Sequence, residues 1–477
     1  MAFTHLPNEL LREIIILSLP ESFENLALTC KEIFALCSPF IAHHSKLRLH
    51  FRRFRYGYRP RMKADMLVTR PYPLLSAYMF IAQIAIDPVV ARHVQEADLY
   101  ADSQPNRYCE KSFQKLKADA CCEEKVMKLL ADSSYLQEAG LDWREYYTTI
   151  KEDFYQRRYS QYAAAFLLTL LPNVKSFTLP WRWESLEATD KLIDAIILRA
   201  RQASPPHGRA SIAQVTAFTS TRSLHTTAAF LSLPQVRHLK CSQGFRPVNS
   251  QADSLSAYQH PRPLEKIEEI ALVHATFDEE SMAAFLSHTP CLKSLHYAHS
   301  SVRPFVLQDW DFCGVINAIG CQVGTHLVKL SITIDTLRDC VVRGKALMRG
   351  FQRLEKLQFP LEIAMSNLTA SISTECEIKY PVFFLCDLVP ASVSELSLLS
   401  RGKDQHERAL EAMFHDFAAN KKSQVPALQK IYLSHHRDAD NAYKEQCAKV
   451  AIEAEEASVI LHLRDDFAPL PEWNYKH

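Results

Sequence analysis

The hexamer "LEKLQF", residues 354–359, follows an apolar-x-x-apolar-x-apolar pattern. Side chains alternate between the two faces of a β-strand, so its fourth and sixth residues point to one face and its third and fifth to the other. The apolar fourth and sixth residues predict a buried face, whereas Lys356 and Gln358 predict a polar one. The hexamer therefore predicts a short strand with one face in a core.

The same pattern recurs along the chain at irregular intervals of 24 to 39 residues. Its eight clear copies begin at Val174, Val236, Ile267, Leu292, Leu327, Leu354, Val393 and Leu428. A weaker copy, "IAQVTA", begins at Ile212. Self-similarity at periods of roughly 20–50 residues is typical of repeat proteins, and irregular intervals favour an open solenoid over a propeller with blades of fixed size.

Segments with helical periodicity lie between the predicted strands. In "DEESMAAFLSHTP", residues 278–290, Asp278 is a candidate N-cap, and Met282, Phe285 and Leu286 form an apolar face. One strand and one helix per repeat resembles the leucine-rich-repeat family, although the family's asparagine or cysteine at the ninth repeat position is missing from all eight clear copies. The resemblance implies an irregular α/β solenoid with a parallel sheet. The alternative is a generic α/β domain.

The N-terminal stretch "LPNELLREIIILSLPESFENLALTCKEIFAL", residues 6–36, is rich in apolar residues. An Arg-Glu pair interrupts its apolar run, whereas a secretory signal has an unbroken one. Leu10, Ile14 and Leu17 recur at helical spacing, "PES" then breaks the helix, and a second helical period follows. The stretch predicts a helical hairpin of the size that usually needs a partner or a docked neighbour for stability.

This hairpin sequence resembles an F-box, whose pattern runs Leu-Pro-x-Glu-Leu-Leu-x-x-Ile, a short connection, and then Leu-x-Leu-x-Cys-Lys. The resemblance implies docking on the Skp adaptor, which joins F-box proteins to a cullin, while the rest of the chain captures a protein substrate for ubiquitin transfer. F-boxes followed by degenerate leucine-rich repeats are typical of fungal F-box proteins. The implied adaptor contacts are the matching positions Leu6, Pro7, Leu10, Leu11, Ile14, Leu26, Leu28, Cys30 and Lys31.

The two resemblances together predict an all-helical F-box at residues 1–45, a basic and aromatic linker with a helical capping region at 46–165, and a leucine-rich-repeat-like solenoid at 166–477. The leading hypothesis is a non-catalytic substrate receptor of a Skp-cullin-F-box ubiquitin ligase. The alternative is an interaction scaffold that binds the adaptor outside a ligase. Substrate contacts are expected at third and fifth strand positions, namely His238, Lys240, His296, Lys329, Lys356, Gln358, Lys430 and Tyr432.

The stretch "KLRLHFRRFRYGYRPRMK", residues 46–63, interleaves basic and aromatic residues. This combination is used to bind single-stranded nucleic acid, because cations hold phosphates and rings stack on bases. The favoured interpretation is a linker helix whose aromatic rings are packed and whose arginines are solvated or paired with acidic neighbours. Nucleic-acid binding therefore stays the less favoured alternative.

Composition narrows the function further. A net charge of +1 over 477 residues provides no global field that would attract nucleic acid or an acidic membrane. The sequence contains no dinucleotide-binding glycine motif, phosphate-binding loop or nucleophile elbow, so we expect no enzyme activity and no cofactor. Its cysteines and histidines show no metal-ligand spacing, so no metal is expected. Without a signal or a long apolar run, we expect the cytoplasm or nucleus.

Overall fold

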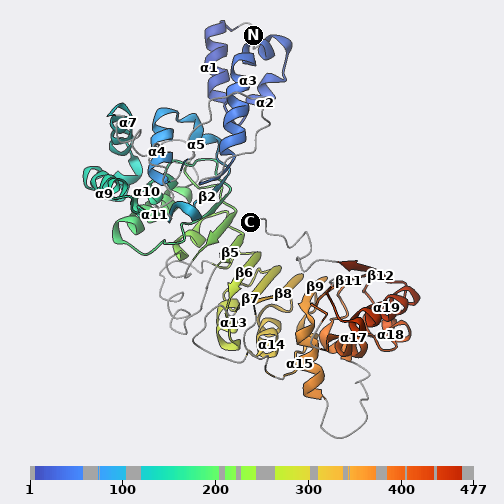
Figure 1. The fold of residues 1–477 in the computed structure, drawn as a ribbon. Helices are drawn as coiled ribbons and strands as arrows, with labels where there is room; N and C mark the ends of the chain where they lie inside the picture. Colours follow the sequence, from blue (N-terminus) through green and yellow to red (C-terminus); the bar gives the residue numbers. More distant parts are fainter. Residues whose placement is uncertain are drawn as a thin grey trace. The chain divides into compact units, whose positions relative to one another are not determined.

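The computed structural model describes residues 6–56, 74, 76–103, 120–202, 210–221, 227–242, 264–300, 310–336, 342, 344–371, 384–402, 405–434 and 438–464 (Figure 1). The chain divides into two compact units. Unit 1 comprises Met1–Thr221 and Thr226–Val236, and unit 2 comprises Arg222–His225 and Arg237–His477. The fold is mixed α/β in both units.

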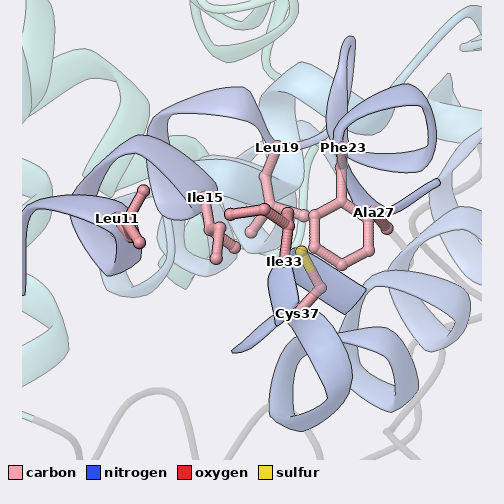
Figure 2. Close-up of a cluster of buried hydrophobic side chains, with 7 residues drawn as sticks. All are labelled: Leu11, Ile15, Leu19, Phe23, Ala27, Ile33 and Cys37. Atoms are coloured by element: carbon pink, nitrogen blue, oxygen red, sulfur yellow. The ribbon is translucent and has the colours of Figure 1, made fainter. Parts of the chain in front are cut away.

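Unit 1 begins with three helices, α1 (Asn8–Ser18), α2 (Phe23–Ala27) and α3 (Lys31–Phe51), which we call the hairpin. The predicted helical hairpin is confirmed, with the short α2 in its connection. Figure 2 shows how the core side chains of the three helices point toward one another. These buried residues are Leu11, Ile15, Leu19, Phe23, Ala27, Ile33 and Cys37. The hairpin therefore has an apolar core of its own.

The rest of unit 1 contains four described strands, which pair in parallel and in chain order. They are β1 (Arg53–Arg55), β2 (Glu96–Asp98), β3 (Ser176–Thr178) and β4 (Ala217–Ser220). The connecting helices are α4 (Ala77–Ile86), α5 (Val89–His93), η2 (Tyr100–Ser103), α7 (Ala120–Ala131), α8 (Ser134–Glu138), α9 (Trp143–Tyr155), α10 (Gln161–Leu168), α11 (Glu187–Ala200) and η4 (Ala228–Ser232). Strands β1 and β2 show that the repeats begin inside the segment predicted to be linker and cap.

Unit 2 contains eight described strands, which also pair in parallel and in chain order. They are β5 (His238–Ser242), β6 (Glu269–Ala275), β7 (Ser294–Ser300), β8 (Lys329–Thr336), β9 (Lys356–Pro360), β10 (Glu395–Leu399), β11 (Lys430–Ser434) and β12 (Ile460–Arg464). This succession of parallel strands confirms the predicted solenoid-like α/β fold.

From β6 onward, described helices lie between consecutive strands of unit 2 in the chain, and α13, α14 and α15 follow one face of strands β6–β9 (Figure 1). The described helices are α13 (Glu279–Leu286), α14 (Phe312–Val323), η5 (Met348–Gly350), α15 (Leu361–Ser371), α16 (Phe384–Leu388), α17 (His406–Phe414), α18 (Phe417–Gln424) and α19 (Asn441–Glu456). Helix α13 begins as predicted, because Asp278 Oδ1 accepts a hydrogen bond from Ser281 N at 2.8 Å. The predicted apolar face of α13, with Met282, Phe285 and Leu286, is buried.

All eight clear hexamers coincide with strands, and each strand begins at the third residue of its hexamer. The register places these third residues side by side, as in the pairs Lys329↔Lys356 and Glu395↔Lys430. The weaker copy at Ile212 is out of register, because Ser176 pairs with Ala217 and the strand of that repeat therefore corresponds to a hexamer starting at Val215. Its position was predicted wrongly by three residues.

Candidate functional site

The hairpin carries large apolar side chains on its outside as well as in its core. Leu10 and Leu17 of α1 are 46% and 70% exposed, Leu28 after α2 is 78% exposed, and Phe34 of α3 is 50% exposed. Leu10 and Leu17 are seven residues apart and lie on the same side of α1, whereas the buried Leu11 and Ile15 lie on the other. We call Leu10, Leu17, Leu28 and Phe34 the apolar face.

The nine predicted adaptor contacts fall into three groups. Exposed are Pro7, Leu10, Leu28 and Lys31, and half-buried are Leu6, Ile14, Leu26 and Cys30. Leu11 is only 4% exposed and belongs to the hairpin core, so it offers no surface to a partner. The F-box pattern missed Leu17 and Phe34, although the helical period that contains Leu10, Ile14 and Leu17 already placed Leu17 beside them.

A polar cluster holds the end of α1 against the first repeats of unit 1. Glu21 accepts hydrogen bonds from Arg92 Nη2 and from Asn173 Nδ2, both at 2.6 Å, and Arg92 Nη2 also donates to Leu17 O at 3.1 Å. Partial burial acts to raise the pKa of Glu21, but the bonds from Arg92 and Asn173 outweigh it and leave this pKa below its ordinary value. The hairpin is thus anchored by a charged carboxylate.

Two buried histidines form a second contact between the hairpin and the repeats. Nε2 of His93 in α5 lies 3.2 Å from Nδ1 of His44 in α3, and Nδ1 of His93 lies 3.0 Å from Val89 O. A carbonyl oxygen only accepts, so His93 Nδ1 carries the proton and His93 Nε2 accepts from His44. Burial lowers the pKa of His93, which favours this neutral form, although the bond to Val89 O opposes the shift. The two rings, 5.2 Å apart between centroids, pack α3 against α5.

The third strand positions of unit 2 form a row across β5–β11 that carries ionisable side chains except at the buried Ser294 of β7. Nδ1 of His238 lies 2.9 Å from Glu269 Oε2, and Glu395 lies between Lys356 at 3.1 Å and Lys430 at 3.2 Å. The hydrogen bond to Glu269 raises the pKa of His238, and the same bond lowers the pKa of Glu269. These side chains are partly exposed, so the row is available to a partner.

The fifth strand positions carry polar side chains that are bound to one another. Ser331 Oγ donates to Gln358 Oε1 at 2.7 Å, and Gln358 Nε2 donates to Ser397 Oγ at 3.1 Å. A hydroxyl has one proton, so Ser331 accepts from His296 Nδ1, which lies 3.0 Å away. All four residues are buried, and burial, followed by the charge of Lys240, lowers the pKa of His296 to about 4. We call them the buried ladder.

The buried ladder changes the set of candidate substrate contacts. His296 and Gln358 belong to it and provide no exposed surface, so both are removed from the set. Lys240 and Tyr432, the other predicted contacts at fifth positions, are half-buried, and the Tyr432 ring stacks on His462 with 4.9 Å between centroids. His238, Lys329, Lys356 and Lys430 all lie in the third-position row.

The basic stretch at residues 46–63 is described as far as Tyr56, and residues 57–63 lie outside the described part. Arg53 and Arg55 pair with Glu96 at 3.1 Å and Asp98 at 3.2 Å on the neighbouring strand β2, and Arg48 pairs with Glu24. The ring of Phe54 stacks on Phe80 with 4.1 Å between centroids. Paired arginines and a packed ring match the favoured interpretation, although part of the stretch is strand β1 and not helix.

Comparison with known proteins assigns no family, because no protein-family model matches the chain and no curated protein matches it significantly. Among the described helices, none has the length and apolarity needed to cross a membrane. The same described residues contain no group of three or more side chains placed to bind a metal ion.

Proposed function

We propose that this chain is the substrate-recognition subunit of a Skp-cullin-F-box ubiquitin ligase. Its hairpin binds the Skp adaptor, and its repeats bind a protein substrate. The observation that carries the proposal is the apolar face on a hairpin that already has a complete core of its own. Several large apolar side chains exposed on one small domain mark a candidate partner surface, since their exposure brings the fold no stability.

The geometry of the hairpin suits such a docking module. Arg92 and Asn173 hold the end of α1 through Glu21 and the Leu17 carbonyl, and the side chain of Leu17 stays exposed. A receptor acts by holding a lysine of its substrate near the ubiquitin-carrying enzyme, which raises the effective concentration of that lysine. The receptor itself therefore needs no general acid, base or metal.

Co-purification from cells that contain the adaptor and cullin tests this function. Leu10→Asp with Leu28→Asp places two charges on the apolar face, and we expect adaptor recovery to fall at least about tenfold, because an interface cannot bury unpaired charges without a cost of several kcal/mol. Both positions are exposed in the free chain, so folding should be retained.

The matched control is Leu198→Asp with Ile452→Asp, which changes two exposed apolar residues outside the hairpin in the same way. It should leave adaptor recovery unchanged. Adaptor binding that survives the hairpin variant contradicts the F-box assignment. Recovery of the adaptor without cullin supports the scaffold alternative instead.

A further inference from the structure

The third-position row of unit 2 has an excess of positive charge at one place. Lys329 and Lys356 are directly opposite each other on β8 and β9, at the strand spacing of about 4.8 Å. Like charges at paired positions of a sheet destabilise it. The side chain of Lys329 forms no hydrogen bond or ion pair within the described residues, although it is attracted to the charge of Glu269 two strands away.

The two glutamates of the row do not neutralise this excess. Glu269 is hydrogen-bonded to His238, and Glu395 is shared between Lys356 and Lys430. Between β8 and β11 the row thus holds three lysines and one glutamate. An added anion near Lys329 and Lys356 would relieve their mutual repulsion. Charge complementarity therefore favours a negatively charged binding partner at this place.

We propose that the lysine row, Lys329, Lys356 and Lys430, binds an extended acidic segment of a protein. The segment crosses the strands of unit 2 and places carboxylates near the three ammonium groups. This inference rests on the proposed role of the chain as a substrate receptor and names the class of segment that it recognises. Beyond Lys430, the stacked rings of Tyr432 and His462 offer a contact for an apolar residue of the same segment.

A protein segment fits this surface better than nucleic acid. The Glu395 carboxylate lies between Lys356 and Lys430, Glu269 lies two strands before Lys329, and both would repel a nucleic acid that carries a phosphate at every nucleotide. The row also contains no arginine, which binds phosphate in a two-pronged geometry. A peptide with spaced acidic residues can place its carboxylates over the lysines and neutral residues over the glutamates.

The test uses the full-length chain and a fluorescein-labelled peptide of alternating Glu and Ser, followed by fluorescence anisotropy. Lys329→Glu with Lys356→Gln should weaken binding about tenfold, because losing two attractions and adding one repulsion of several tenths of a kcal/mol each amounts to about one power of ten. The control, Lys422→Glu with Lys449→Gln, makes the same charge change at exposed helix positions of unit 2 and should leave affinity unchanged.

A gain of affinity separates recognition from misfolding. Glu395→Gln removes the carboxylate that competes for Lys356 and Lys430, so it should strengthen peptide binding by about threefold. Equal weakening by the lysine-row variant and its control would reduce the effect to net charge and overturn the proposal, as would an absence of peptide binding. Tighter binding of labelled oligo-deoxythymidine than of the peptide, lost in the same variant, would favour nucleic acid instead.

This titration does not involve the adaptor. Loss of peptide binding with normal adaptor recovery would reject the acidic segment and leave the proposed function standing. Peptide binding without any adaptor recovery would reject the proposed function and leave the acidic-segment site standing.

Discussion

Helix α1 of the hairpin and strand β9 of unit 2 each have one face in a core, and they differ in what the other face carries. On α1 that face presents Leu10 and Leu17 to solvent. On β9 it carries Gln358, bound within the buried ladder, and Lys356, paired with Glu395. The outer face of α1 thus leaves apolar side chains in water unless a partner covers them. The polar side chains of β9 have partners within the sheet, and only an excess of positive charge remains there.

The largest expected effect separates the two faces of α1. Ile15→Asp places a charge in the hairpin core, where the side chain is 1% exposed, and should destabilise the hairpin by at least about 4 kcal/mol. Leu17→Asp, two residues on at 70% exposure, should change stability by less than about 0.5 kcal/mol. Amide hydrogen exchange of α1 and α3 measures both, and equal effects would mean that the apolar face is not a free surface.

A buried polar group without full hydrogen bonding gives the next effect. Asp102 Oδ1 accepts from Ala77 N at 2.9 Å, but Oδ2 has no hydrogen-bond partner among the described residues. Burial raises the pKa of this carboxyl to about 7, although the bond from Ala77 opposes the shift. The members of the buried ladder are hydrogen-bonded to one another, whereas the Asp102 carboxyl avoids a buried charge by holding its proton to a higher pH than an exposed carboxyl does.

The pH dependence follows from that raised pKa. The pKa of this carboxyl in the unfolded chain is about 3.9, so the folded state binds the proton more tightly. The protonated carboxyl therefore contributes its full stabilisation below about pH 4, and this contribution is lost as the pH rises to about 7. The loss amounts to at most about 4 kcal/mol in unit 1. Asp102→Asn should flatten this slope in urea unfolding of unit 1 between about pH 5 and 7. An unchanged slope would assign the dependence to other groups.

The sequence pattern identified the strands better than it placed them in domains. "FRRFRY", residues 51–56, and "VQEADL", residues 94–99, also fit the hexamer and form β1 and β2. The arginines of the first stretch dominate its composition and predict a basic linker, yet Phe54 and Tyr56 are buried like the fourth and sixth residues of other repeats. The Ile212 copy failed because the true strand ends in Ser220 at the sixth position, where the pattern requires an apolar residue.

The candidate substrate contacts are harder to predict than the strands. The alternation of side chains along a strand shows which face a residue is on, but not whether that residue is exposed. Lys356 and Gln358 point to the same face of β9, but only Gln358 meets hydroxyls at the right height on both neighbouring strands. That match depends on the register of three hexamers that lie far apart in the chain. On α1, local helical spacing predicts that Leu10 and Leu17 share a face, but the F-box resemblance also assigned the buried Leu11 to the adaptor contacts.

The smallest effect tests whether the buried ladder is bound together as described. Gln358→Met keeps the volume and removes both hydrogen bonds, which should cost about 2 kcal/mol because the hydroxyls of Ser331 and Ser397 lose a buried partner. Ser397→Ala alone leaves Gln358 Nε2 without that acceptor, but the double variant removes both members of the pair. We therefore expect the two single costs in urea unfolding of unit 2 to exceed the double cost by about 1 kcal/mol. Additive costs would mean that Gln358 and Ser397 do not stabilise each other through a hydrogen bond.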